Sequence, residues 1–519
     1  MDWDRRLRPE RWRRRRVRRA RRLVALGVFL AACTIFIYAL AHRHAPSARP
    51  QLQAGAPARA LRTTGWLRAG TLWSKADLAR LHTALAAQAA LPVFPQSTGI
   101  LVLDGRDGHV LFSRNAQLAL VPGSTVKLIT AAAAFAALGP QYRFTTEMVS
   151  DGPIEGTTLD GKLWLIGGGD PELTSDDLRR GIHELQLAGI GQIAGDVEVD
   201  GSRYGADVVS PSWQRDDLQY GWAAPASALS LDGGSVQFTI MPRPGTQADV
   251  AIDPPGERVI ASVDTAASDA ANTLTIEAAP DGSAYLVRGQ IPYGAPQKYW
   301  RAVAHPTKST ATSLAAMLRL AGIGVSGSAG TDPAPARRAV LWQHRSRPLD
   351  QIVKHMFALS DNHYAEQLLR EVGWQASGLG TLDNSLQAEQ GFLRGEGISR
   401  DEALLADGSG LSAQNKVSAR ALGAMLRFLL MQPMPEPPFT LLPRAGIEGT
   451  VAVRELAPSA LGRVFAKDGY IEGASSIAGY VVTAHHGPMI FVFMVNDWQQ
   501  GLDAVWAAED RMLDSMATF

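Results

Sequence analysis

The distribution of apolar and polar residues divides this 519-residue chain into regions of different texture. Residues 75–90 and 502–516 have the apolar spacing of amphipathic helices. The segment GILVLDGRDGHVLFS, which begins at Gly99, predicts two strands joined by an Asp-Gly turn. From about residue 148 to 338, short apolar runs alternate with Gly, Asp and Pro, as in KLWLIGGGD, GDVEVDG, SVQFTIMP and AYLVRGQIP. This contrast predicts a β-rich region inserted into a body that mixes helices and strands.

Helices and strands are also expected on both sides of the insertion. The alanine-rich stretch 121–138 predicts a buried helix that Ser124 opens. The late runs SSIAGYVVTA and MIFVFMVND are apolar enough to be central antiparallel strands. Strands and helices from both ends of the chain can therefore form one α+β domain. The helices expected between the insertion and the late strands cover 348–359, 364–372 and 418–431.

The N-terminus has the charge pattern of a membrane anchor. Residues 1–22 contain twelve arginines, and the uncharged apolar segment 23–41 is nearly long enough to cross a bilayer core of about 30 Å. Because arginines mark the cytoplasmic side, the chain after residue 42 is expected outside the cytoplasm, on the periplasmic or extracytoplasmic side. Residues 42–70, rich in Ala, Pro, Arg and Gln, predict a linker to the folded body. A basic nucleic-acid arm beside a buried core helix is the alternative for the first two segments.

Two sequence patterns leave open whether the apolar segment is retained, cleaved or lipidated. Ala39-Leu40-Ala41 resembles a signal-peptidase site, and Leu30-Ala31-Ala32-Cys33 resembles a lipoprotein box. An uncleaved anchor is favoured, because the apolar run continues past Cys33 where a lipoprotein has a polar tether. Cys33 is the only cysteine, so the exported part is expected to contain no disulfide and no reactive thiol.

Charge is distributed unevenly along the chain. The formal net charge is +1, yet removing residues 1–22 leaves 39 basic and 47 acidic residues, a net charge of −8. A mildly acidic body lacks the basic face that nucleic-acid binding requires. We therefore expect no nucleic-acid partner.

Ser124 and Lys127 form the only S-x-x-K in a chain with eight lysines. Three residues apart at a helix start, their side chains leave the same face, where an amine can take the proton of the hydroxyl. A lysine becomes a useful base only if burial or a neighbouring cation lowers its pKa. The alternative is a helix-capping serine followed by a solvated lysine.

Two further polar groups have the residue types of a substrate site. Ser360-Asp361-Asn362 lies between two predicted helices, where a hydroxyl can relay a proton and an amide can hold a substrate; a helix cap is the alternative. Lys467-Asp468-Gly469 precedes the late strands. There a lysine can attract a carboxylate and the glycine permits a close backbone approach, whereas a strand-end turn is the alternative.

The three groups occur in the order helix-starting S-x-x-K, interhelical S-x-N and strand-borne K-x-G. In this order the chain resembles the D-alanyl-D-alanine carboxypeptidase/endopeptidase family, the low-molecular-mass penicillin-binding proteins with a large insert between the first two motifs. The step of 236 residues from Ser124 to Ser360 accommodates such an insert. Several further segments look like family segments, and the resemblance runs from about residue 75 to the end: GSTVKLITAAAAFAALGPQYRFTTE, GGGDPELT, SALSLDGGSV, SDNHYAEQLLREVG, DGSGLS, LPRAGIEGTV and SSIAGYV.

The resemblance implies a penicillin-binding/β-lactamase-like α+β domain, an antiparallel sheet with helices, interrupted by the β-rich region. The expected catalytic serine hydrolase domain comprises residues 71–147 and 339–519, and the expected insert comprises 148–338. The implied substrates are stem peptides of peptidoglycan in the bacterial cell envelope, with β-lactams as covalent ligands. No metal or other cofactor is expected, and the sequence leaves the oligomeric state open.

The resemblance also implies a role for each matching residue. Ser124 would attack the carbonyl between two D-alanines with Lys127 as base, and Ser360 would pass a proton to the leaving amine. Asn362 would bind the substrate backbone and Lys467, ahead of Gly469, its terminal carboxylate. The remaining implied positions are the backbone N–H groups of Ser124 and Tyr470 as an oxyanion hole, and Asp217 and Trp222 as contacts to the side chain of the peptide stem.

The chain departs from the family pattern at two positions. The third motif has Asp468 where the family has Thr or Ser, and Ala413 follows DGSGLS where many relatives have a basic residue. Both changes weaken the expected attraction for a substrate carboxylate. Because Ser124, Lys127, Ser360 and Asn362 are all present, an active hydrolase is nevertheless favoured. The two alternatives are a catalytically impaired, membrane-tethered protein that binds peptidoglycan or acts as a scaffold, and a β-lactam or ester hydrolase on the same fold.

Overall fold

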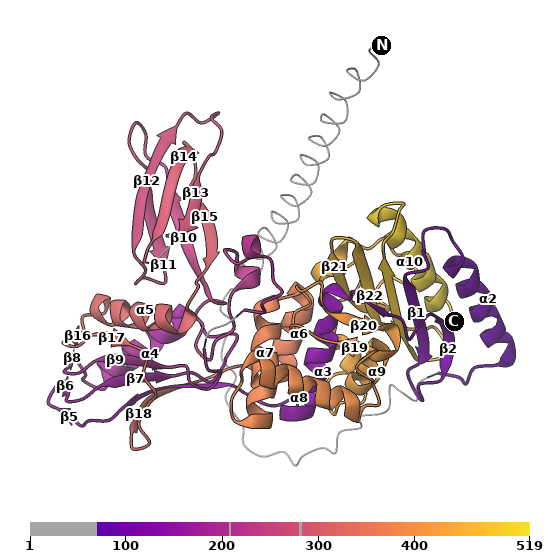
Figure 1. Cartoon of the computed structure of the whole chain (residues 1–519), viewed down its shortest axis with the longest axis horizontal. Helices are drawn as coiled ribbons and strands as arrows, with labels where there is room; N and C mark the ends of the chain where they lie inside the picture. The colour runs from indigo at the N-terminus through magenta and orange to yellow at the C-terminus, as the bar shows by residue number, and fades with distance from the viewer. Residues whose placement is uncertain (1–69, 207–208, 280–282) are drawn as a thin grey trace, which may run out of the picture. The chain divides into compact units, whose positions relative to one another are not determined.

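The computed structural model describes residues 70–206, 209–279 and 283–519 (Figure 1). The expected basic segment 1–22, the membrane segment 23–41 and nearly all of the linker 42–70 lie outside these residues. Among the residues that are described, no helix combines the length and the apolar character that crossing a membrane requires.

A five-stranded antiparallel sheet in the order β2-β1-β23-β22-β21 brings both ends of the described chain together. Strand β1 near the N-terminal end pairs with β23 near the C-terminal end, with Ile100 opposite Phe493. All residues of β23 and nearly all of β22 are buried, which explains why their sequences are continuously apolar instead of alternating. The strands are β1 (Thr98–Asp104), β2 (Val110–Arg114), β21 (Val464–Ile471), β22 (Ala474–Val482) and β23 (Pro488–Asn496).

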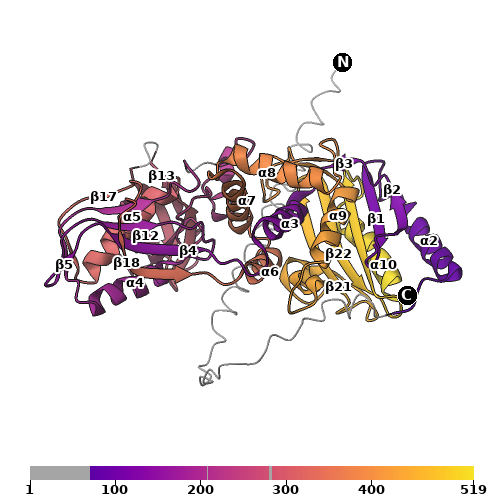
Figure 2. The same cartoon turned by 90° about the horizontal axis from the view of Figure 1, so that it is seen from below.

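Helices cover both faces of this sheet (Figures 1 and 2). One face packs against α2 (Lys75–Ala89) and α10 (Leu502–Ala517) in a core that includes Leu81, Phe491 and Met512. The other face forms a larger core with α3, α6, α7 and α9. The helices on this second face are α3 (Lys127–Leu138), α6 (Leu349–Leu359), α7 (Asn362–Ser377), α8 (Leu382–Gly395) and α9 (Ala419–Leu430).

The mixed α+β architecture is confirmed, with two local differences from the sequence expectation. The helix expected over 121–138 is divided into a 3-10 turn, η1 (Gly123–Val126), followed by α3. The helix α8 was not predicted, although Thr381 caps it by accepting a hydrogen bond from the backbone N–H of Asn384.

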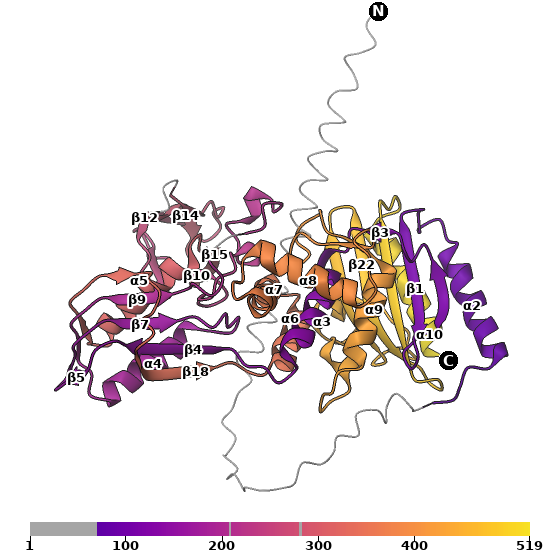
Figure 3. The same cartoon turned by 60° about the horizontal axis from the view of Figure 1, so that its bottom comes forward.

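The region between β4 and β18 contains two further hydrophobic cores (Figure 3). It is not made of strands alone: α4 (Ser175–Leu187) and α5 (Pro306–Leu320) pack against the sheet β17-β9-β7-β4-β18. The strands of this sheet are β4 (Thr145–Ser150), β7 (Leu163–Ile166), β9 (Val197–Asp200), β17 (Ala329–Gly330) and β18 (Ala339–Arg345). The strands of the smaller sheets are β5 (Ile154–Glu155), β6 (Thr158–Leu159), β8 (Gln192–Ile193), β16 (Gly324–Val325), β10 (Ser235–Met241), β11 (Asp249–Asp253), β15 (Gln297–Ala302), β12 (Val259–Ala266), β13 (Thr275–Ala278) and β14 (Tyr285–Pro292).

The strands β4 and β18 pair with each other, so they belong to the same sheet. The domain limits expected at 147/148 and 338/339 fall within β4 and immediately before β18. The exact limits of the inserted region stay a prediction. The pairing shows that the strand on which the chain enters this region lies next to the strand on which it leaves.

Glu371 on α7 is the centre of a buried polar cluster that fixes this helix to the inserted region. Its side chain has no exposed surface and accepts two hydrogen bonds from Arg203, at 2.6 and 2.9 Å. The hydroxyls of Tyr204 and Tyr142 donate to the same carboxylate at 3.0 and 2.7 Å. The guanidinium of Arg203 also lies 3.3 Å from the ring centroid of Trp374. Because Asn362 begins α7, this cluster helps to position the start of that helix.

We expect Glu371→Ala to destabilise the folded body by about 3 kcal/mol, because it leaves Arg203 and two tyrosine hydroxyls without their shared acceptor. Chemical unfolding followed by fluorescence measures this loss. The matched control is Glu396→Ala at an exposed position, which should change stability by less than about 0.5 kcal/mol. Equal stability of the two variants would contradict the assigned role of the cluster.

Candidate active site

Ser124 and Lys127 are in contact at the start of α3. The ammonium Nζ of Lys127 lies 3.1 Å from Ser124 Oγ and donates to Asn362 Oδ1 at 2.7 Å and to the carbonyl of Ser409 at 2.6 Å. Lys127 is fully buried, and the side chain of Ser124 does not cap a helix. A capping serine with a solvated lysine is therefore the wrong interpretation of this motif.

The environment of Lys127 lowers its pKa from 10.5 to about 7. Burial is the largest cause, since it disfavours the charged form, and the positive charge of Lys467 acts in the same direction. The carboxylates of Asp407, Asp361 and Glu366 oppose the shift only in part. A substantial fraction of the amine is therefore neutral near pH 7 and can accept a proton from a hydroxyl 3.1 Å away.

Ser360 and Asn362 lie at the junction between α6 and α7. Ser360 ends α6 in the left-handed conformation, with φ 55° and ψ 35°, which a residue with a Cβ rarely adopts. Asp361 caps α7 by accepting from the N–H of Tyr364 at 3.1 Å, so the helix-cap interpretation holds for this residue. The amide of Asn362 is instead turned to Lys127. Within the described residues the hydroxyl of Ser360 has no hydrogen-bond partner.

Lys467, Asp468 and Gly469 lie within β21 and not at a strand-end turn. Their partners on β22 are Ala478, Ile477 and Ser476. Lys467 is fully buried, and its Nζ donates to the carboxylate of Asp468 at 2.7 Å and to the backbone carbonyl of Asp468 at 2.6 Å. The lysine expected to attract a substrate carboxylate is thus already paired with an acid of its own chain.

Asp468 is held in its ionised form by these contacts. Burial alone would raise its pKa, but the charge and hydrogen bond of Lys467, together with the hydroxyl of Thr450, lower the pKa below the usual value. Thr450 donates to the same carboxylate oxygen that accepts from Lys467, at 2.5 Å. The motif therefore carries a positive and a negative charge side by side.

The backbone around Ser124 packs against the backbone of Gly469 and Tyr470. A Cβ on Gly469 would lie 2.4 Å from the carbonyl oxygen of Pro122 and 2.8 Å from the backbone nitrogen of Ser124. A Cβ on Gly123, whose φ is +53°, would lie 2.8 Å from the nitrogen of Tyr470. Both positions thus require glycine, and the backbone nitrogens of residues 124 and 470 each lie against a glycine of the opposing segment.

The inserted region reaches this cluster through Trp222. The carbonyl of Trp222 accepts a hydrogen bond from Asn362 Nδ2 at 2.9 Å. The residue is 37% exposed, and its indole is stacked on Tyr220 with ring centroids 4.3 Å apart. Burial and the neighbouring charge of Asp216 raise the pKa of Asp217, while a hydrogen bond with the Trp222 side chain partly offsets this effect. Of the two expected insert residues, Trp222 therefore contacts Asn362 through its carbonyl, and Asp217 lies beside the Trp222 side chain.

Sequence reasoning missed the contribution of the loop 407–412 to the lysine site. The carbonyl of Ser409 accepts from Lys127, and the N–H groups of Gly408 and Ser409 donate to the buried carboxylate of Glu366 at 3.0 and 2.9 Å. Burial, followed by repulsion from Asp407, raises the pKa of Glu366 to about 7. The pattern DGSGLS identifies this loop in the sequence, but the residue types do not indicate that one of its backbone carbonyls binds Lys127.

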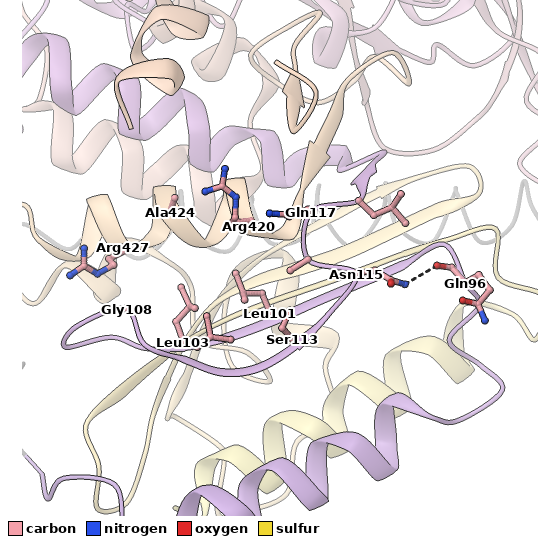
Figure 4. Close-up of a pocket in the computed structure, with 13 residues that line it drawn as sticks. Gln96, Leu101, Leu103, Gly108, Ser113, Asn115, Gln117, Arg420, Ala424 and Arg427 are labelled. Carbon is pink, nitrogen blue, oxygen red and sulfur yellow. Dashed lines mark hydrogen bonds between the residues drawn. The ribbon is translucent and has the colours of Figure 1, made fainter. Parts of the chain in front are cut away.

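Other polar features lie apart from these residues. A cavity of about 740 Å³ lies between β1, β2 and α9, and its lining, which includes Arg420 and Arg427, contains none of the expected site residues (Figure 4). His486 is buried and stacked on Trp73, with ring centroids 4.0 Å apart, whereas His485 is exposed. In the part of the chain that is described, no group of three or more His, Cys, Asp or Glu side chains is arranged to hold a metal ion.

Comparisons with known proteins agree with this arrangement of motifs. A D-alanyl-D-alanine carboxypeptidase from Actinomadura sp. (strain R39) is 31% identical over 444 residues, which are 81% of each chain. The D-alanyl-D-alanine carboxypeptidase DacB of Haemophilus influenzae is 28% identical over 422 residues, 78% of this chain and 86% of the relative.

Solved structures give the same result. The crystal structure of penicillin binding protein 4 (dacB) from Haemophilus influenzae matches 84% of this chain and 99% of its own, with a TM-score of 0.71 and 26% identity. A second structure of that protein, in complex with a β-lactam, matches 83% of this chain and 97% of its own with a TM-score of 0.66 and 26% identity. The family model of the D-Ala-D-Ala carboxypeptidase 3 (S13) family matches residues 81–517. With its motifs and its fold in agreement, this chain belongs to the D-Ala-D-Ala carboxypeptidase 3 (S13) family of serine-type hydrolases.

Proposed function

We propose that this chain hydrolyses D-alanyl-D-alanine bonds of peptidoglycan stem peptides through an acyl-enzyme on Ser124. The observation that carries the proposal is the contact between Ser124 Oγ and a fully buried lysine whose pKa is lowered to about 7. A hydroxyl next to a base of this kind is the arrangement that nucleophilic catalysis requires. Family membership supports the reaction class, and the contact between Ser124 and Lys127 supports the proposed roles of these two residues.

The first half-reaction forms an ester. Ser124 Oγ attacks the carbonyl carbon of the penultimate D-alanine while its proton passes to the neutral amine of Lys127. The oxyanion that develops is stabilised by the N–H groups of residues 124 and 470, an effect usually worth about 3 kcal/mol of the barrier. The C–N bond then breaks, and the leaving amine receives its proton through Ser360. Water attacks the ester in the second half-reaction, which releases the shortened peptide and restores the hydroxyl.

The residues on the rim of the cluster would bind the rest of the substrate. Asn362, held between Lys127 and the carbonyl of Trp222, presents an amide to the peptide backbone. Trp222 and Asp217 would contact the side chain of the peptide stem. The bound β-lactam in the Haemophilus structure supports β-lactams as covalent ligands of this chain also. We place this activity in the bacterial cell envelope, with residues 23–41 as the proposed attachment to the membrane.

One observation keeps an impaired, peptidoglycan-binding protein as the second candidate. Lys467 is paired with Asp468 and is not free to attract a substrate carboxylate. Retention of the nucleophile with its buried base favours the enzyme, because a binding protein has no physical need for a lysine of lowered pKa. An ester or β-lactam hydrolase would use the same nucleophile and differs only in the acyl donor.

We expect fluorescent penicillin to label Ser124 covalently and the full chain to release D-alanine from a D-alanyl-D-alanine peptide. The variant Ser124→Ala should lose both signals, because among the described residues no other side-chain hydroxyl is hydrogen-bonded to the amine of Lys127. In-gel fluorescence and analysis of the peptide products measure the two outcomes. Labelling without peptide cleavage would indicate the impaired protein, and undiminished labelling of Ser124→Ala would exclude this nucleophile.

The acylation rate should increase with pH up to about pH 7 and then level off. Lys127 acts as a base only when neutral, so each unit below its pKa of about 7 should reduce the rate about tenfold. The profile is measured as the rate of acylation by a penicillin between pH 5 and 9. A rate that stays constant over this range would contradict the role of Lys127.

Two substitutions should move this pH profile in opposite directions. Removing the positive charge in Lys467→Met should raise the pKa of Lys127 and shift the rise in rate upward, by about one pH unit. Removing the negative charge in Asp361→Asn, which keeps a side-chain oxygen to cap α7, should lower that pKa and shift the rise downward. A general loss of structure would reduce the rate in both variants but would not shift their pH profiles in opposite directions. Shifts in the same direction would show that the charges do not act on Lys127 as proposed.

A further inference from the structure

The charge pair in β21 bears on which substrates fit the proposed active site. The side chain of Lys467 has no exposed surface, whereas that of Asp468 is 29% exposed. A molecule that enters from solvent therefore meets the carboxylate before the ammonium. Since one positive and one negative charge lie 2.7 Å apart, the pair has no net charge to offer a ligand.

One of the two carboxylate oxygens of Asp468 is free to accept a hydrogen bond from a ligand. The hydrogen bonds from Lys467 and Thr450 both end on its Oδ1. Within the described residues Oδ2 receives no hydrogen bond. An ionised carboxylate oxygen in this position is complementary to an N–H donor and unfavourable for a second carboxylate.

The proposed function assigns Asp468 to the leaving side of the scissile bond, because Lys467 beside it would meet the terminal carboxylate of the substrate. Strand β21 is the edge of the central sheet, and Gly469 packs on the backbone nitrogen of Ser124. In the proposed function, a substrate whose scissile carbonyl is bound by the N–H groups of residues 124 and 470 would lie along this edge, and its next residue would reach Asp468. For an ordinary carboxypeptidase that residue ends in a carboxylate, which would add an uncompensated negative charge beside Asp468.

We propose that Asp468 is a specificity residue that selects leaving groups whose D-centre carries a primary carboxamide in place of a free carboxylate. A carboxamide donates its N–H to Asp468 Oδ2 and adds no negative charge beside the pair. This inference rests on the proposed function and names its substrate class. It implies cleavage of stem peptides with amidated D-centres, as within amidated cross-links, in preference to trimming of free D-alanine ends.

The test compares two substrates on the unmodified full chain. The substrates are one N-acylated D-alanyl-D-alanine peptide that ends in a free carboxylate and the same peptide that ends in a primary carboxamide. We expect kcat/KM to be about tenfold or more higher for the carboxamide, because the carboxylate leaves Asp468 unpaired and adds like charge. Equal values, or a preference for the carboxylate, would overturn the inference.

A third acyl donor separates this inference from the function on which it rests. The benzyl thioester of the same N-acyl-D-alanine has a leaving group with neither carboxylate nor amide, and mass spectrometry detects its ester on Ser124. If the thioester does not acylate Ser124, the proposed function fails and the inference with it. If it does acylate Ser124 and the carboxamide peptide is not cleaved, the inference alone is overturned.

Substitution of Asp468 provides the matched control. Asp468→Thr should invert the preference toward the carboxylate, by about tenfold or more, since it frees Lys467 and supplies a hydroxyl donor. Penicillin carries a carboxylate, so its acylation of this variant should be faster than that of the unmodified chain. Asp503→Asn removes an equal charge at an exposed position on α10 and should leave the preference unchanged. An Asp468→Thr variant with unchanged preference would assign the selectivity to another residue.

Discussion

The proposed site depends on the burial of one ammonium group beneath Ser124. Lys127 has no contact with solvent, and its Nζ is held by Ser124, Asn362 and the carbonyl of Ser409. These three partners come from three separate segments of the chain, so the lysine can be buried only when all of them are assembled. Burial of a charge without partners is costly, and these acceptors leave the amine satisfied yet easily deprotonated. The same contacts therefore serve folding and chemistry.

The inserted region is connected to this site by polar contacts and not only by the chain. Glu371 fixes α7 to Arg203 and Tyr204, and Asn362 at the start of α7 binds the carbonyl of Trp222. Both sets of contacts involve α7, and its first residue, Asn362, also binds Lys127. The insert thereby contributes to the position of an amide in the site and supplies an exposed aromatic surface beside it.

The third motif changes the electrostatics of the site while keeping its geometry. Gly469 still allows β21 to approach Ser124 closely, and Lys467 still lowers the pKa of Lys127. The hydrogen bonds of Lys467 are directed to Asp468, which accepts both of them. The lysine thus retains its influence on the base, while the surface offered to a leaving group becomes a neutral pair with a free acceptor.

The sequence by itself determined the α+β class, the strands on either side of the insertion, most helix positions and the three polar groups of the site, because apolar periodicity and residue spacing are local properties. It did not determine α8, the helices α4 and α5 within the insert, or the 3-10 turn that carries Ser124. Only the tertiary structure decided that Lys127 is buried, that Ser409 and Glu366 support it, and that Asp468 pairs with Lys467. These features depend on contacts between residues up to hundreds of positions apart, whose distances and solvent exposure no local pattern encodes.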